Sequence, residues 1–214
     1  MERYAAVPFE VLSPKRFKIE RPETPEEDRP FVFLRNFDEV NQQYSDLVVV
    51  VEEQKFYVSK WILSQHSDFF KAMLGNANFK DSAKSEFKLE DQTPQAFQYF
   101  MEAIMGDPSI NDRSVEKVLA ISDYLLAKAP IKRCENFLIH FSAMSYQKKY
   151  EIAQKYKLKD LTLAAIEQVK NADQLKVICP QDLSSLDKET MTKFLAKSLE
   201  LLPNRPNRII ALDF

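Results

Sequence analysis

Residues 46–70 read DLVVVVEEQKFYVSKWILSQHSDFF, and this stretch decides the fold. Leu47–Val51 is a continuous apolar run rich in β-branched residues, which is typical of a buried strand. After a short polar turn, Gln54–Val58 places Phe56 and Val58 on one face of a second extended segment. The two runs therefore predict a hairpin that leads directly into a helix.

The remaining sequence predicts one more strand and a series of helices. Ser59 precedes the first helical pattern, and we expect its hydroxyl to cap that helix. Glu86–Glu90 alternates like a strand, and Thr93 with Pro94 opens the next helix. Apolar residues at helical spacing then form successive faces, namely Phe97, Phe100, Met101 and Ile104, then Val118, Ile121 and Leu125, then Cys134, Leu138 and Phe141. A break at Ala143–Ser145 separates these from later helical patterns at Tyr150–Tyr156, Leu161–Val169, and Met191, Phe194, Leu195, Leu199 and Leu202.

Composition limits the classes of function. With 214 residues, 45% of them hydrophobic, the chain can bury one good core and a small helical annex. A net charge of −2 gives no general attraction to nucleic acid or to an anionic membrane, so neither partner is predicted. No signal peptide or membrane-length apolar run is recognised, and Cys134 and Cys179 lie far apart. We expect a cytoplasmic or nuclear protein without a disulfide framework.

Catalytic and metal chemistry find little support in the sequence. His66 and His140 are the only histidines, and neither lies in a recognisable nucleophile setting. Together with the two cysteines they are too scattered to predict a zinc site. Only two glycines occur, which disfavours a glycine-rich phosphate loop. We expect no enzyme activity, no metal and no cofactor.

The residue types at fixed offsets across the hairpin and helix resemble a BTB/POZ domain. The matching positions are Asp46, Lys60, Leu63, Ser67 and Phe70, and the resemblance covers roughly 37–170. It is most similar to the BTB half of MATH-BTB proteins. The resemblance implies an α+β BTB/POZ fold, a small sheet flanked by helices, with a helical C-terminal extension similar to a three-box or BACK start. We expect a flexible N-terminal segment and linker at 1–30, the BTB domain at 31–143, and the extension with a tail at 144–214.

The resemblance also implies three sets of site residues: a cullin-binding motif at Phe79, Lys80 and Asp81, a dimer interface at Phe31, Phe33, Leu34, Phe37 and Val40, and a charged groove pair at Asp46 and Lys60. Asp81 stands where the family motif has Glu. Each set has a structural alternative. Phe79 could fold back onto its helix end, the arm aromatics could cap the monomer core, and Asp46 and Lys60 could be separate surface residues.

The implied function is a protein–protein interaction module. The leading expectation is a substrate-specific adaptor of a cullin-RING ubiquitin ligase, with a cullin scaffold and an unknown substrate protein as partners. No MATH domain, kelch array or zinc finger is recognised, so substrate capture is expected at Met1–Arg35 or in the C-terminal helices. The alternative is a BTB scaffold that pairs with itself or with another BTB protein, including in transcriptional regulation, without binding a cullin. A third possibility is a decoy that competes with full adaptors, and it would use the same contacts as an adaptor.

Overall fold

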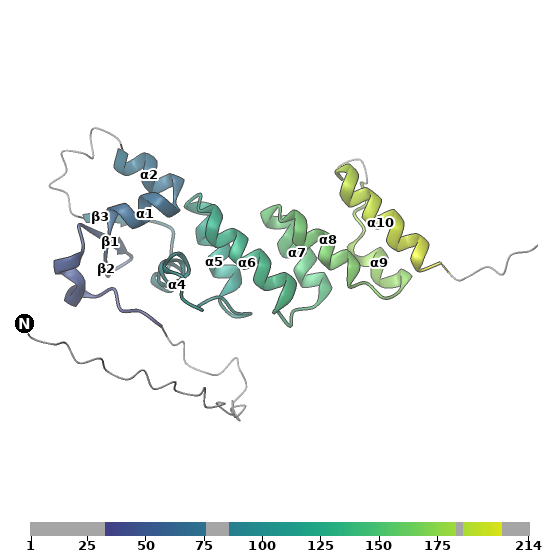
Figure 1. Cartoon of the computed structure of the whole chain (residues 1–214), viewed down its shortest axis with the longest axis horizontal. Helices are drawn as coiled ribbons and strands as arrows, with labels where there is room; N and C mark the ends of the chain where they lie inside the picture. The colour runs from purple at the N-terminus through teal and green to yellow at the C-terminus, as the bar shows by residue number, and fades with distance from the viewer. Residues whose placement is uncertain (1–32, 76–85, 183–185, 203–214) are drawn as a thin grey trace, which may run out of the picture. The chain divides into compact units, whose positions relative to one another are not determined.

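The hairpin forms as predicted and lies at the centre of a small mixed sheet. β1 (Leu47–Val51) and β2 (Gln54–Val58) pair antiparallel, with Val49 opposite Phe56. β3 (Glu86–Leu89) pairs parallel with β1, which gives the strand order β2-β1-β3. These are the strands found in residues 33–75, 86–182 and 186–202, the parts that this computed structural model describes (Figure 1).

Helices build the rest of the BTB-like region. After a 3-10 helix (Glu39–Tyr44) and the hairpin come α1 (Lys60–His66), α2 (Asp68–Gly75), α4 (Pro94–Met105), α5 (Val115–Tyr124) and α6 (Lys128–His140). The predicted start of α4 is confirmed, because Thr93 Oγ1 accepts the backbone N–H of Ala96 at 3.3 Å. Every residue of α4 from Ala96 to Ile104 is buried, so α4 is the central helix of this region.

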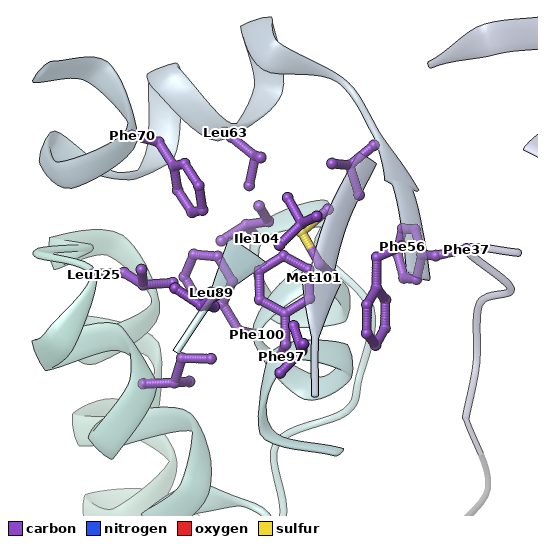
Figure 2. Close-up of a cluster of buried hydrophobic side chains, with 14 of the residues drawn as sticks. Phe37, Phe56, Leu63, Phe70, Leu89, Phe97, Phe100, Met101, Ile104 and Leu125 are labelled. Carbon is purple, nitrogen blue, oxygen red and sulfur yellow. The ribbon is translucent and has the colours of Figure 1, made fainter. Parts of the chain in front are cut away.

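The main core lies between the sheet and helices α1, α2 and α4 (Figure 2). Phe56 from β2 meets Phe97 from α4 edge to face, with ring centroids 4.9 Å apart. Phe70 and Leu63 close the core from the side of α1 and α2, and both are fully buried. Phe56 and Val58 of β2 face inward as the sequence predicts, whereas β1, predicted as a continuous buried run, alternates between buried and partly buried positions.

Four further helices follow α6: α7 (Tyr146–Tyr156), α8 (Lys159–Glu167), α9 (Ala172–Ile178) and α10 (Lys188–Glu200). α8 packs on α6, on α7 and on α10, so the extension continues the helical layer that α5 and α6 begin (Figure 1). The predicted α+β class, a small sheet flanked by helices with a helical extension, is confirmed. α9 was not predicted, because its seven residues are fewer than the window over which a helical period can be recognised.

Two local expectations were wrong. Ser59 precedes α1 with extended backbone, but its side chain makes no capping hydrogen bond. Phe141 does not continue the buried face of α6, because it lies beyond the helix end and is 77% exposed. The helical pattern predicted from Met191 onward is confirmed by α10, in which Phe194 is buried, whereas Leu195 and the apolar positions that follow it are largely exposed.

Candidate functional site

An arm at residues 33–37 lies along α4, held there by polar side chains of that helix. Glu102 Oε1 accepts the backbone N–H groups of Leu34 at 2.6 Å and of Arg35 at 3.2 Å. Gln98 Nε2 donates to the backbone oxygen of Arg35 at 2.7 Å and to Glu102 Oε1 at 2.8 Å. The Arg35 guanidinium also pairs with both carboxylate oxygens of Asp107. The arm is thus fixed on this chain's own α4.

Aromatic and sheet contacts complete the attachment of the arm. The Phe33 ring meets Tyr99 edge to face at 5.8 Å. Phe37 is buried in the main core, and its backbone oxygen accepts the N–H of Tyr57 in β2 at 2.8 Å. The arm therefore spans from the outer side of α4 to the edge of the sheet.

A groove of about 410 Å³ opens beside this arm. Its walls come from the arm, the 3-10 helix, β2, α1 and α4, and its apolar lining includes Ile62, Met101 and Met105. Leu34 at its rim is 48% exposed and Tyr44 is 79% exposed. This is a concave apolar surface with exposed large side chains at its edge, the character of a protein-binding surface.

The predicted dimer residues are partly described. Phe33, Leu34 and Phe37 share the arm, the first two about half exposed and the third buried. Phe31 lies outside the described residues, and so does the side chain of Val40. The structure therefore brings three of the five predicted residues to one element, and their use in a dimer stays a prediction.

The predicted pair Asp46 and Lys60 is brought together, through the backbone of Lys60. Asp46 Oδ1 accepts the Lys60 N–H at 2.6 Å, at the first residue of α1. Among the residues that the structure describes, no ion pair within 4.0 Å joins the two side chains. Asp46 thus supplies the helix cap that Ser59 does not, and its charge lies at the positive end of the helix.

The predicted cullin motif, Phe79, Lys80 and Asp81, lies outside the described residues. An exposed apolar pair that the sequence analysis missed lies beside α2, the helix that precedes this segment. Tyr124 is 44% exposed and Leu126 is 57% exposed, where α5 ends before α6. The Tyr124 ring lies 6.1 Å from that of Phe69 in α2, and the Leu126 backbone oxygen accepts from Asp68 N at 3.3 Å. The helical period of the sequence does not predict that Leu126 is exposed. Its backbone has a positive φ of 53° just after α5, so the helical period no longer applies there.

A buried carboxylate of α6 holds the extension in place. Glu135 is 5% exposed, and its Oε1 accepts the backbone N–H of Leu161 in the first turn of α8 at 3.2 Å. Lys132 Nζ bridges Glu135 Oε2 at 2.8 Å and Asp160 Oδ2 at 2.6 Å. The hydrogen bond from Lys132 lowers the pKa of Asp160. This network fixes α8 against α6.

A second tie joins the start of the extension to the α4–α5 connection. Asp112 Oδ2 accepts the backbone N–H of Ala143 at 3.0 Å, and Lys149 Nζ donates to the Ser142 oxygen at 3.0 Å. Burial lowers the pKa of Lys149, while the nearby charge of Asp112 opposes that shift. The link between α6 and α7 is therefore bound to neighbouring elements at Ser142 and Ala143.

The described residues offer no group of three or more His, Cys, Asp or Glu side chains that could hold a metal ion. The same part of the chain includes no helix with the length and apolarity needed to span a bilayer.

Comparison with known proteins identifies the region just described. Residues 37–142 match the family model of the BTB/POZ domain. The chain is 34% identical over 172 residues to BTB and MATH domain-containing protein 45 of Caenorhabditis elegans, with 80% of this chain and 36% of the relative aligned. It is 36% identical over 137 residues to BTB and MATH domain-containing protein 15 of the same species, with 64% of this chain and 50% of the relative aligned. The solved BTB domain of human gigaxonin aligns with 46% of this chain, at 19% identity and a TM-score of 0.39. The chain spans half or less of the length of those two relatives. It is a BTB/POZ domain protein related to the BTB and MATH domain proteins of Caenorhabditis elegans.

Proposed function

We propose that this chain is a non-enzymatic protein interaction module that acts as a substrate-specific adaptor of a cullin-RING ubiquitin ligase. The observation that carries the proposal is the BTB/POZ domain at 37–142 followed by helices fixed to it through Glu135. An adaptor must hold a scaffold and a client at a defined separation, and a buried carboxylate that caps α8 from α6 favours such rigidity.

The proposed scaffold contact combines Phe79 and Asp81 with the exposed pair Tyr124 and Leu126. The first two stand at the hydrophobic and acidic positions of the family's hydrophobic-any-Glu motif, and Asp81 departs from it by replacing Glu. The second two lie beside α2, the helix that leads into the segment carrying the motif. Large apolar side chains near a carboxylate suit a cullin helix, because aromatic anchors dominate the binding energy of many interfaces.

Calorimetric titration of the purified chain with a cullin N-terminal domain tests the proposal. We expect a Kd in the micromolar range or below, and a loss of about 30-fold or more for Phe79→Ala, the weakening expected of a hot-spot residue. Leu126→Ser should also weaken binding. Trp61→Ala is the matched control, because Trp61 is 69% exposed on α1 and takes no part in the proposed contact. Absence of binding by a well-folded chain would overturn the proposal.

A second candidate function is a self-associating BTB scaffold that binds no cullin. The groove beside the arm favours it, because Leu34 and Tyr44 present exposed apolar area at its rim. Light scattering over a concentration series tests this candidate. We expect Leu34→Asp to shift a dimer to monomer and Leu126→Asp to leave it unchanged. A wild-type chain that stays monomeric at all concentrations would exclude it.

A further inference from the structure

The last described helix, α10, has apolar side chains on two faces. Phe194 is 5% exposed and packs with Tyr150 of α7, so one face of α10 packs on the preceding helices. On the other face lie Met191 (43% exposed), Leu195 (60%) and Leu199 (60%), and Leu202 (61%) follows two residues beyond the helix end. We call these four exposed apolar side chains the α10 stripe. Their spacing of four, four and three places them on one side of a helix.

An exposed stripe of this kind is unusual at the end of a stack of helices. In stacked helical arrays the terminal helix needs a polar outer face for solubility. Between the stripe residues, however, the outer face of α10 carries the small uncharged residues Thr192 and Ser198. The composition of this face is that of a helix covered by another element.

The area of the stripe argues against a second copy of the chain as its cover. Burying a side chain of leucine or methionine size removes on the order of 100 Å² from water. Four partly exposed side chains therefore offer a few hundred Å² at most, short of the roughly 800 Å² that each partner contributes to a stable interface. A segment of the same chain needs far less, because its effective concentration is already in the millimolar range.

We propose that the C-terminal segment Ile209–Phe214 docks on the α10 stripe. The segment lies outside the described residues, and its sequence fits the stripe in three respects. Pro203 and Pro206 follow α10 and stop the helix, with enough residues before Ile209 to reverse the chain. In an extended segment Ile210, Leu212 and Phe214 lie on one side.

Length and charge fit the same arrangement. Met191 and Leu199 are separated by about 12 Å along the helix axis, and six extended residues span up to about 20 Å. In a segment running antiparallel to α10, Asp213 approaches Lys188, an exposed residue that begins the helix on the side of the stripe. The far end of the segment thus pairs opposite charges beside the apolar positions. A docked segment would block the binding of other proteins to the stripe.

Trypsin cleavage after Arg208 tests the proposal on the full chain. Release of the peptide 209–214 is followed by mass spectrometry, because a docked segment must detach before this bond is cut. We expect Leu195→Ser with Leu199→Ser to speed release about tenfold, the change that follows from removing a local barrier to opening. The bond that trypsin cuts and the residues around it are identical in the wild type and the stripe variant, so a difference in rate reports on docking. Val177→Ser is the control, because Val177 is a 64% exposed residue of α9 outside the stripe.

Two results would overturn the proposal. Equal release rates from the wild type and the stripe variant would mean that the segment is not docked there. Release that slows as wild-type protein concentration rises would assign the stripe to a second copy instead. Thermal unfolding followed by circular dichroism checks that the variants stay folded. Should the stripe variant unfold, Ile210→Ser with Leu212→Ser keeps the test open, with increased binding of an apolar dye to the stripe as the expected result.

Discussion

Asp46 Oδ1 lies 2.6 Å from the backbone nitrogen of Lys60, so the carboxylate before β1 caps α1, fourteen positions later in the chain. The cap joins the start of the hairpin to the helix that follows it. Ser59, the residue at the ordinary capping position, makes no such bond. Two residues that the family resemblance pairs by charge are thus connected by a backbone hydrogen bond.

This relationship predicts different costs for the two residues. Asp46→Ala should lower the free energy of unfolding by about 1 kcal/mol, the usual value of a helix cap. Asp46→Asn keeps an acceptor oxygen and should cost less, and Lys60→Ala keeps the backbone donor and should change stability by no more than about 0.5 kcal/mol. Urea unfolding measures all three. A large cost for Lys60→Ala, with strong coupling in the double variant, would instead indicate a side-chain ion pair.

The attachment of the arm to α4 predicts a large effect at Glu102. This residue is fully buried and accepts from the backbone of both Leu34 and Arg35. Glu102→Ala leaves those donors without their acceptor and should cost on the order of 2 kcal/mol. The rate of hydrogen exchange at the backbone amides of Leu34 and Arg35 should also rise in this variant. Glu116→Ala, in a half-exposed surface pair with Lys148, is the control and should cost about 0.5 kcal/mol or less.

Buried Cys134 predicts a clear difference between the two thiols. Burial raises the pKa of Cys134 from 9.0 to about 12, so its thiolate is scarce at pH 8. A disulfide reagent should label half-buried Cys179 in the native chain and Cys134 only after unfolding. A Cys179→Ser variant should then have no thiol that reacts rapidly in the native chain. Rapid labelling of that variant would contradict the prediction that Cys134 is protected by burial.

The raised pKa of Cys134 also gives stability a definite pH dependence. The unfolded chain loses the thiol proton near pH 9.0, whereas the folded chain keeps it to about pH 12. The stabilisation that the raised pKa of Cys134 represents is therefore complete below pH 9 and is lost as the pH rises from 9 towards 12. The stability difference between wild type and Cys134→Ala should narrow from pH 8 to pH 10.

The sequence predicted the hairpin, α4 and the break before the extension, because each depends on local signals of apolar period, turn and cap. It could not predict that Glu102 holds the arm or that Glu135 caps α8, because each bond joins residues far apart in sequence. Both acids occupy positions in helices where charge usually indicates a solvated face. Exposure of Leu195 was missed for the converse reason, since helical spacing identifies an apolar side chain without showing what covers it.

Glu135 supplies the prediction that bears most directly on rigidity between the BTB domain and its extension. Its buried Oε1 accepts the Leu161 N–H, and Lys132 neutralises Oε2. Glu135→Ala removes the acceptor from the first turn of α8 and should cost about 2 kcal/mol, because a buried donor loses its partner. Asp160→Ala removes only the 60% exposed end of the same network and should cost about 0.5 kcal/mol or less. Hydrogen exchange should rise first in α8 and α10 of the Glu135 variant, since α10 packs on α8. Equal costs for the two substitutions would show that the extension is held by apolar packing alone.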